Sequence, residues 1–197
     1  MKKIFIIILL AIIAPLFYII VTNYNNIPKL DENVKEKWSQ VQNQYKRRAD
    51  LIPNLVETVK GYASHEKSTF VEVTEARSKV SQMNINADTL NNPAAMEQFS
   101  AAQNGLSSAL SKLMVVVEKY PELKANENFQ ALQSQLEGTE NRITVARRDF
   151  IEAVKLYNLE LRTMPGKLVA AIAHPEAQIK ETFTASPTEQ EAPKVKF

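Results

Sequence analysis

The sequence of 197 residues contains no cysteine, only four glycines and only two histidines. The lack of cysteine excludes disulfide bonds, thiolate metal sites and cysteine nucleophiles. The sequence also shows no glycine-rich phosphate-binding loop and no serine nucleophile motif. We therefore expect a protein that is not an enzyme and that needs no cofactor.

Beyond its first three residues the chain also carries no excess of positive or negative charge. The formal net charge is +2, and removing Lys2 and Lys3 leaves 22 basic residues against 22 acidic ones. Proteins that bind nucleic acids usually carry a basic stripe, whereas both signs alternate along this chain. We therefore expect no nucleic-acid partner.

The residues that are present favour helices. Hydrophobic residues make up 45% of the chain, which is enough for a buried core. The long segments are rich in Ala, Leu, Glu, Lys and Gln, and these residues favour helix over sheet. The length fits one ordinary domain. The sequence therefore predicts a single domain of the all-α class.

An apolar run over residues 4–21 follows a short basic start at residues 1–3. Eighteen helical residues span roughly 27 Å, which is just enough to cross the hydrocarbon core of a membrane. A cleaved signal peptide normally has a shorter apolar region and a small-residue cleavage site, and the stretch FYIIVTNY offers no such site. We therefore predict a transmembrane anchor at residues 4–22, with a cleaved signal as the alternative.

Apolar residues recur at helical spacing in three later segments, at about residues 34–80, 94–120 and 129–162. The second and third segments carry apolar residues seven positions apart. These are Phe99, Leu106, Leu113 and Tyr120, and then Phe129, Leu136, Ile143, Phe150 and Tyr157. Sevenfold spacing is typical of helices that pack at a shallow angle. Residues 23–174 are therefore predicted to form a long antiparallel bundle resembling a four-helix bundle.

Pro53 lies inside the first segment. Because proline lacks an N–H and clashes with the preceding turn, we expect a kink or a restart of the helix there. The apolar piece GKLVAAIAH (166–174) either caps the bundle or lies against the membrane. Residues 175–197 are rich in Pro, Thr and charge, which predicts a disordered tail.

Charged residues interrupt the apolar stripes of the predicted helices. Arg48, Glu66 and Arg77 fall on the stripe of the first segment, and Glu140 and Arg147 flank that of the third. Buried charges need partners, and arginine pairs with carboxylates across helices. We predict a buried or half-buried polar layer that locks the first helix to its neighbours. Its members are Arg47, Arg48, Asp50, Glu66, Arg77, Glu140, Arg147, Arg148 and Asp149. The alternative is a set of solvated surface pairs worth about 0–1 kcal/mol each.

No metal site is expected. The pair His65 and Glu66 begins a zinc-protease motif, but the position of its second histidine holds Thr69, and the chain has only one other histidine, His174. A di-iron bundle would need Glu-x-x-His on two helices, and no such pattern occurs.

Several stretches of the sequence resemble the LemA family. They are WSQVQNQYKRRADLIPNLVETVKGYASHE (38–66), TEARS (74–78), YPELKANENFQALQSQLEGTENRITVARRDFIEAV (120–154) and YN (157–158), and the resemblance covers roughly residues 24–165. It implies a bacterial protein with one N-terminal membrane segment and a domain of long helices. No enzymatic activity is established for the family. The resemblance implies association with an HtpX-like membrane zinc metalloprotease or with small membrane proteins.

Three functions follow as hypotheses. The first is a membrane-anchored scaffold of the bacterial envelope that self-associates or binds another membrane protein. The second is an adaptor or regulator of an HtpX-like metalloprotease in envelope quality control. The third, less favoured, is an anion receptor that uses the Arg/Glu layer. The expected partners are the lipid bilayer, a second copy of the chain and another envelope protein. The short basic head favours the bacterial inner membrane, with the helical domain on the periplasmic or extracytoplasmic side.

Overall fold

The computed structural model describes residues 2–83 and 86–183, and these residues form helices joined by short turns. In chain order the elements are α1 (Lys2–Lys60), α2 (Lys67–Gln82), the 3₁₀ helix η1 (Ala87–Asn91), α3 (Pro93–Val117), α4 (Pro121–Lys124), α5 (Glu127–Arg162) and α6 (Gly166–Ala173). The predicted all-α class is confirmed.

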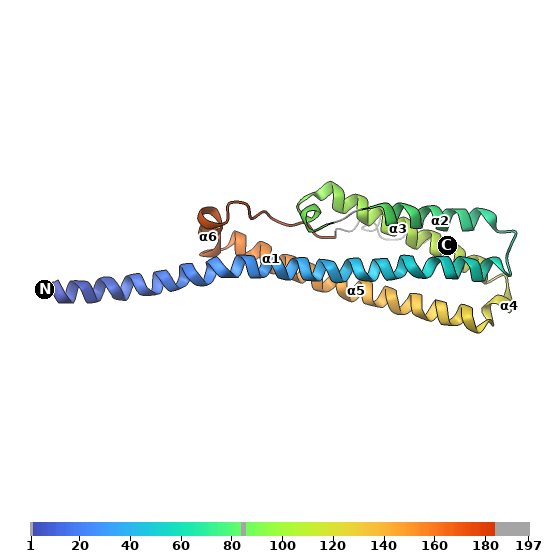
Figure 1. The fold of residues 1–197 in the computed structure, drawn as a ribbon, viewed down its shortest axis with the longest axis horizontal. Coiled ribbons are helices and arrows are strands. Elements are labelled where there is room, and N and C mark those ends of the chain that lie inside the picture. Colours follow the sequence, from blue (N-terminus) through green and yellow to red (C-terminus); the bar gives the residue numbers. More distant parts are fainter. Residues whose placement is uncertain (1, 84–85, 184–197) are drawn as a thin grey trace, which may run out of the picture.

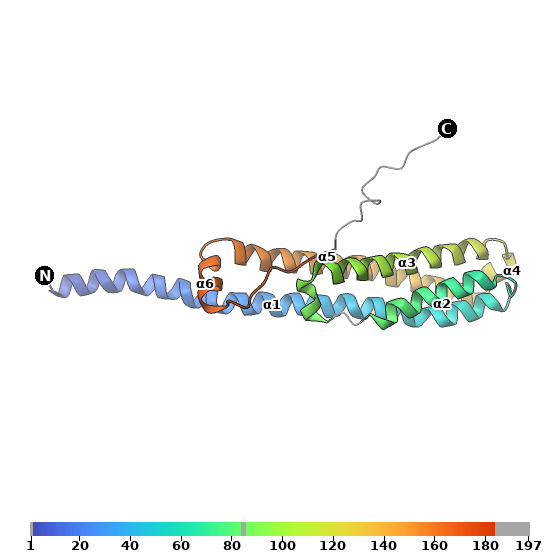
Figure 2. The ribbon, with the colours of Figure 1, turned by 90° about the horizontal axis from the view of Figure 1, so that it is seen from above.

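The long helices pack as two antiparallel pairs. α1 and α5 lie side by side along the whole length of the bundle, and α2 and α3 form the second pair (Figures 1 and 2). The α2–α3 pair covers the half of the bundle farther from the N-terminus, and α4 lies at the far tip. α6 lies at the opposite end, where α1 leaves the bundle.

The first part of α1 extends beyond the other helices (Figure 1). By length and composition α1 is long and apolar enough to cross a membrane. Among the side chains that the structure describes in this part, the large aliphatic ones are exposed: Ile4, Ile6, Ile7, Leu9, Leu10, Ile13, Ile20 and Val21. An apolar surface of this extent on one helix is typical of a segment that lies in lipid. The chain is therefore compatible with a single-pass membrane protein.

The buried side chains form two clusters along the bundle. The proximal core, nearer the projecting part of α1, includes Ile27, Val34, Trp38, Val41, Tyr45, Phe99, Ile143, Phe150 and Tyr157. The distal core includes Ile52, Leu55, Val59, Phe70, Leu106, Leu113, Phe129 and Leu136. The residues predicted from sevenfold spacing are thus buried, except for Tyr120, which is partly buried and packs against the distal core.

The first predicted segment breaks at residues 61–66 and not at Pro53. α1 continues through Pro53 to Lys60, and Figure 1 shows no sharp bend in that part of the helix. The following turn keeps Ala63 fully buried, and its N–H donates to the carbonyl of Val59 at 2.9 Å. Because a buried residue lies within the turn, the apolar spacing runs on from α1 into α2 and conceals the break. Gly61 was the one sequence sign of it.

Residues 175–183 pack against the bundle, whereas the sequence predicted disorder from residue 175. The Asn158 side chain of α5 accepts a hydrogen bond from the Lys180 N–H at 3.0 Å and donates one to the Lys180 carbonyl at 2.9 Å. Buried Lys180 forms an ion pair with Asp31 of α1 at 2.8 Å. Phe183 lies against Trp38, with ring centroids 6.0 Å apart. Composition predicted the tail wrongly here, because these contacts depend on α1 and α5 being adjacent. Residues 184–197 of that predicted tail lie outside the described residues.

Candidate functional site

A layer of polar side chains separates the proximal core from the distal core. Arg48 of α1 is its centre, with only 2% of its surface exposed. Its Nη1 donates to Glu140 Oε1 of α5 at 2.9 Å and to Ser107 Oγ of α3 at 3.0 Å. Its Nη2 donates to the side-chain oxygen of Gln103, also on α3. One guanidinium group thus connects three helices.

The Arg48–Glu140 pair is asymmetric in burial. The side chain of Glu140 is 44% exposed, so the carboxylate keeps much of its hydration while the guanidinium loses nearly all of its own. The buried charge is compensated by its hydrogen bonds and by the face of the Tyr45 ring, 5.1 Å from the guanidinium carbon. Burial raises the pKa of Tyr45, and the charges of Arg147 and Arg48 oppose this rise.

The layer is poorly suited to capture a free anion. Both terminal nitrogens of Arg48 already donate to protein oxygens. Of the three guanidinium nitrogens of Arg48, only Nε lacks a hydrogen-bond partner among the residues that the structure describes. An anion would have to displace Glu140, so the geometry favours a clamp between helices over the anion receptor.

A second charged residue, Arg77 of α2, contacts the backbone of α1 near Pro53. The residue four positions before Pro53 is Ala49, whose carbonyl oxygen would normally accept the N–H that proline lacks. Arg77 Nε of α2 donates to this oxygen at 2.8 Å. The guanidinium thereby satisfies the carbonyl that Pro53 frees, so α1 continues through the proline without an unsatisfied carbonyl.

The same arrangement recurs at Pro28. The carbonyl freed four positions earlier belongs to Tyr24, and His174 Nε2 lies 3.0 Å from it. Because a carbonyl oxygen can only accept, Nε2 carries the proton in this contact. The imidazole ring also lies 4.8 Å from the Tyr24 ring. His174 thus fixes the end of α6 to α1.

The remaining predicted members divide between the interior and the surface. Arg147 is half-buried, with its guanidinium carbon 4.3 Å from the Phe183 ring centroid. Glu66 is half-buried in the turn after α1 and pairs with Lys119 at 3.7 Å. Both residues are half-buried, and their partners in the structure are ones that the sequence did not indicate.

The other members do not join the layer. Arg47 and Asp50 are exposed, and no ion pair is formed by either within residues 2–83 and 86–183. Arg148 is exposed and pairs with its neighbour Asp149 at 3.1 Å. Successive helical residues point about 100° apart, and the core lies on the side of Arg48 and Ala49, so Arg47 on the other flank faces solvent. The prediction that Arg47 and Asp50 lock α1 to its neighbours was therefore wrong.

Two buried polar residues of the layer were missed by the sequence analysis. Gln103 lies between Phe99 and Leu106 on the apolar stripe of α3, and Thr139 lies between Leu136 and Ile143 on that of α5. A polar residue at an apolar stripe position is the signal that would have found both. Each marks the level at which the two cores separate.

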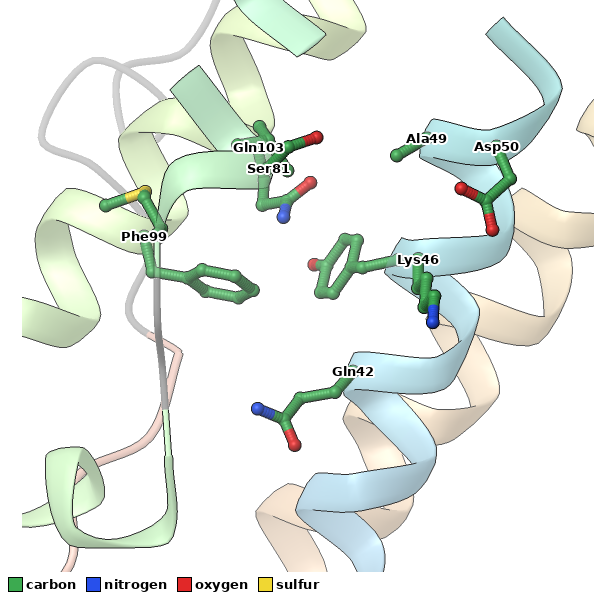
Figure 3. Close-up of a pocket in the computed structure, with 10 residues that line it drawn as sticks. Gln42, Lys46, Ala49, Asp50, Ser81, Phe99 and Gln103 are labelled. Carbon is green, nitrogen blue, oxygen red and sulfur yellow. The ribbon is translucent and has the colours of Figure 1, made fainter. Parts of the chain in front are cut away.

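A cavity of about 300 Å³ opens beside the layer, between α1, the end of α2 and α3. Figure 3 shows Gln42 and Ala49 of α1 facing Phe99 and Gln103 of α3 across it. Its walls are mainly apolar, and the buried Gln103 Nε2 lacks a hydrogen-bond partner within the part of the chain that the structure describes. In the same described part, no group of three or more His, Cys, Asp or Glu side chains is placed to hold a metal ion.

Comparison with known proteins shows the family of this chain. The profile of the LemA family matches residues 37–197. The chain belongs to the LemA family. The match reaches residue 197, beyond residue 165 where the resemblance seen in the sequence stopped, so α6 and the segment after it fall within the matched region.

Curated relatives are distant in sequence. The chain is 26% identical over 168 residues to the magnetosome protein MamQ 2 of Paramagnetospirillum magneticum, covering 76% of this chain and 61% of the relative. It is 25% identical over 165 residues, with the same coverage, to the magnetosome protein MamQ of Magnetospirillum gryphiswaldense. It is 24% identical over 170 residues to the protein LemA of Metamycoplasma hominis, covering 86% of this chain and 74% of that protein. The chain therefore spans about three fifths of the length of the magnetosome relatives.

Proposed function

We propose that this LemA-family protein is a non-enzymatic, membrane-anchored scaffold of the bacterial envelope. The observation that carries the proposal is the continuity of α1, in which one helix, Lys2–Lys60, forms both the apolar segment and a central helix of the bundle. A rigid connection of this kind holds the bundle in a fixed orientation relative to the apolar segment. A flexible linker would not transmit that orientation.

Self-association is the first activity of this scaffold. Val145, Leu156 and Leu159 are each about half-exposed, and their separations of 11 and 14 residues place them on one face of α5. Anchored copies share one orientation in the membrane, so a two-fold axis along the membrane normal would bring the same face of two copies together. The partner for this α5 stripe is a second copy of the chain.

We infer that the scaffold lies in the inner membrane, with the bundle on the periplasmic or extracytoplasmic side. The basic residues before the apolar segment support this orientation. A membrane metalloprotease or another envelope protein is the second kind of partner, and would use a face of the bundle that the second copy leaves free.

The absence of cysteine permits a direct test of self-association. Single variants Val145→Cys, Leu156→Cys and Leu159→Cys are oxidised in native membranes, with Val115→Cys as the matched exposed valine on α3. We expect disulfide-linked dimers at positions on the α5 stripe and few or none at position 115. Equal yields at all four positions would indicate random collision and would refute the stripe as the interface.

Partners are identified by chemical crosslinking in the same membranes, followed by mass spectrometry. Self-crosslinks within α5 support the scaffold, and a dominant crosslink to a membrane metalloprotease would identify the protein as an adaptor. Extraction of the protein by alkaline carbonate, without detergent, would refute the anchor itself.

A further inference from the structure

α6 differs from the long helices of the bundle in its position and direction. It lies at the end of the bundle where the apolar part of α1 emerges, and it runs crosswise to the bundle axis between the end of α5 and α1 (Figure 2). Figure 1 shows the same helix nearly end-on. If α1 crosses the bilayer, α6 is the bundle helix that lies along the membrane surface.

The two sides of α6 differ sharply in environment. Val169 and Ala170 are buried and belong to the proximal core. Leu168 is 54% exposed and Ile172 is 76% exposed, and Met164 just before the helix is 72% exposed. Leu168 and Ile172 lie four residues apart and therefore on one face of α6, and Met164 lies in the turn that leads into the helix. We call Met164, Leu168 and Ile172 the α6 apolar face.

A contact between His174 and Tyr24 fixes the position of α6 along the axis of α1. His174 Nε2, at the end of α6, lies 3.0 Å from the carbonyl oxygen of Tyr24. Tyr24 follows Val21, the last residue of the apolar run, by three positions or about 4.5 Å along the helix axis. The α6 apolar face therefore lies within about one helical turn of the level at which the hydrocarbon ends.

The polar surroundings of α6 suit a headgroup layer. Arg162 and Lys167 are exposed beside the apolar face, and cationic side chains near a bilayer surface are attracted to lipid phosphates. Tyr24 on α1 is also exposed at this level, and tyrosine is enriched at membrane–water interfaces. Tyr18, also exposed, lies about 9 Å farther towards the N-terminus along the helix axis. An apolar face flanked by basic side chains is typical of a helix that lies in the interface.

We propose that α6 is a second membrane contact, with Met164, Leu168 and Ile172 inserted among the lipids of the bilayer that α1 crosses. This proposal rests on the anchor assigned under Proposed function. It makes the membrane hold the bundle at two points, which restricts the tilt of the bundle relative to the bilayer. The proximal core is then completed by lipid on its membrane side.

The test uses single-cysteine variants of the full chain, labelled with the polarity-sensitive fluorophore NBD. Leu168→Cys and Ile172→Cys report on α6, and Ile13→Cys reports on the apolar part of α1. Val115→Cys, an exposed valine of α3 far from the anchor, is the matched control. The proteins are reconstituted into vesicles of phosphatidylethanolamine and phosphatidylglycerol that carry lipid spin-labelled at shallow or deep positions. Iodide is the quencher in water.

We expect the label at positions 168 and 172 to emit at shorter wavelength than at position 115. Shallow spin-labelled lipid should quench it more than deep lipid does, and iodide should quench it little. Position 13 should be quenched best by deep lipid. Iodide quenching at 168 and 172 equal to that at 115 would overturn the proposal while position 13 upholds the anchor.

Two other results have distinct meanings. Labels at 168 and 172 that are protected from both iodide and lipid would overturn the proposal by showing that protein covers α6. Loss of lipid quenching at position 13 would refute the anchor and, with it, this inference. The fold of each variant is checked by the emission of Trp38, which lies in the proximal core.

Discussion

Arg77 donates its Nε–H to the carbonyl oxygen of Ala49, which is the oxygen that Pro53 leaves without a helical partner. A residue on α2 thus compensates for a proline on α1, 24 positions away in sequence. The contact explains why a helix of 59 residues contains a proline near its end without breaking. It also accounts for a charged residue at an inward-facing position of α2.

The Arg77–Pro53 relationship predicts a coupling between the two residues. Arg77→Ala should lower the free energy of unfolding by about 1.5–3 kcal/mol, because a carbonyl in α1 loses its charged donor. Pro53→Ala restores an N–H to position 53, so the same arginine substitution should cost much less in that background. Chemical denaturation of the four proteins of the double-mutant cycle measures the coupling. Additive effects of the two substitutions would contradict the assignment.

Arg48 should be the most sensitive position of the polar layer. Arg48→Ala leaves the buried Gln103 oxygen without its donor and should cost about 3 kcal/mol. For a chain of this length that corresponds to a fall in melting temperature of about 6–12 °C. Glu140→Gln should cost only about 1 kcal/mol, because that side chain is half-exposed.

The exposed neighbour Arg47 is the matched control for Arg48. Arg47→Ala should change the free energy of unfolding by no more than about 0.5 kcal/mol. Thermal melting in detergent, followed by circular dichroism, compares the variants. If the Arg48 and Arg47 variants have the same melting temperature, the layer has no structural role.

The ion pair between Asp31 and Lys180 should make the C-terminal contacts sensitive to acid. Burial raises the pKa of the Asp31 carboxyl, but hydrogen bonds and charge from Lys180 and Lys35 outweigh this effect, and the pKa lies below its ordinary value of 3.8. The stabilisation is therefore fully present above pH 3.8 and is lost as the pH falls through the lower pKa of the folded state. Denaturation midpoints of the wild type and Asp31→Asn should differ at pH 6 and converge in strong acid. A difference that stays constant down to pH 2.5 would contradict the pairing.

Phe183 should anchor the segment that follows α6. Its ring lies 5.7 Å from that of Phe150 and beneath the Arg147 guanidinium. Phe183→Ala should destabilise the protein by about 1–3 kcal/mol, less than for a fully buried ring. It should also change the fluorescence of Trp38, the single tryptophan. Gln178→Ala, an exposed position of the same segment, should leave both quantities unchanged.

Much of the fold follows from local patterns in the sequence. Apolar positions seven apart determine which side of α3 and α5 is buried, since a side chain's direction repeats every two turns whatever the neighbours are. Asn92 and Asn126 mark the starts of α3 and α5, because their side chains accept the N–H groups of Ala95 and Phe129. The apolar run at the N-terminus likewise needs no tertiary information.

Only the tertiary structure decided which polar groups meet. Arg47 and Arg48 are adjacent and chemically identical, and the packing of α3 and α5 against one of them makes it the centre of the layer. Arg77 finds its acceptor only because the turn at residues 61–66 returns α2 alongside α1. Residues 175–183 are ordered by Asn158 and Asp31, which no local pattern joins to them. The spacing of residues in the sequence determines the direction in which each side chain points from its own helix. The partner of a polar side chain depends on the distance between helices, and that distance is set only when the helices pack together.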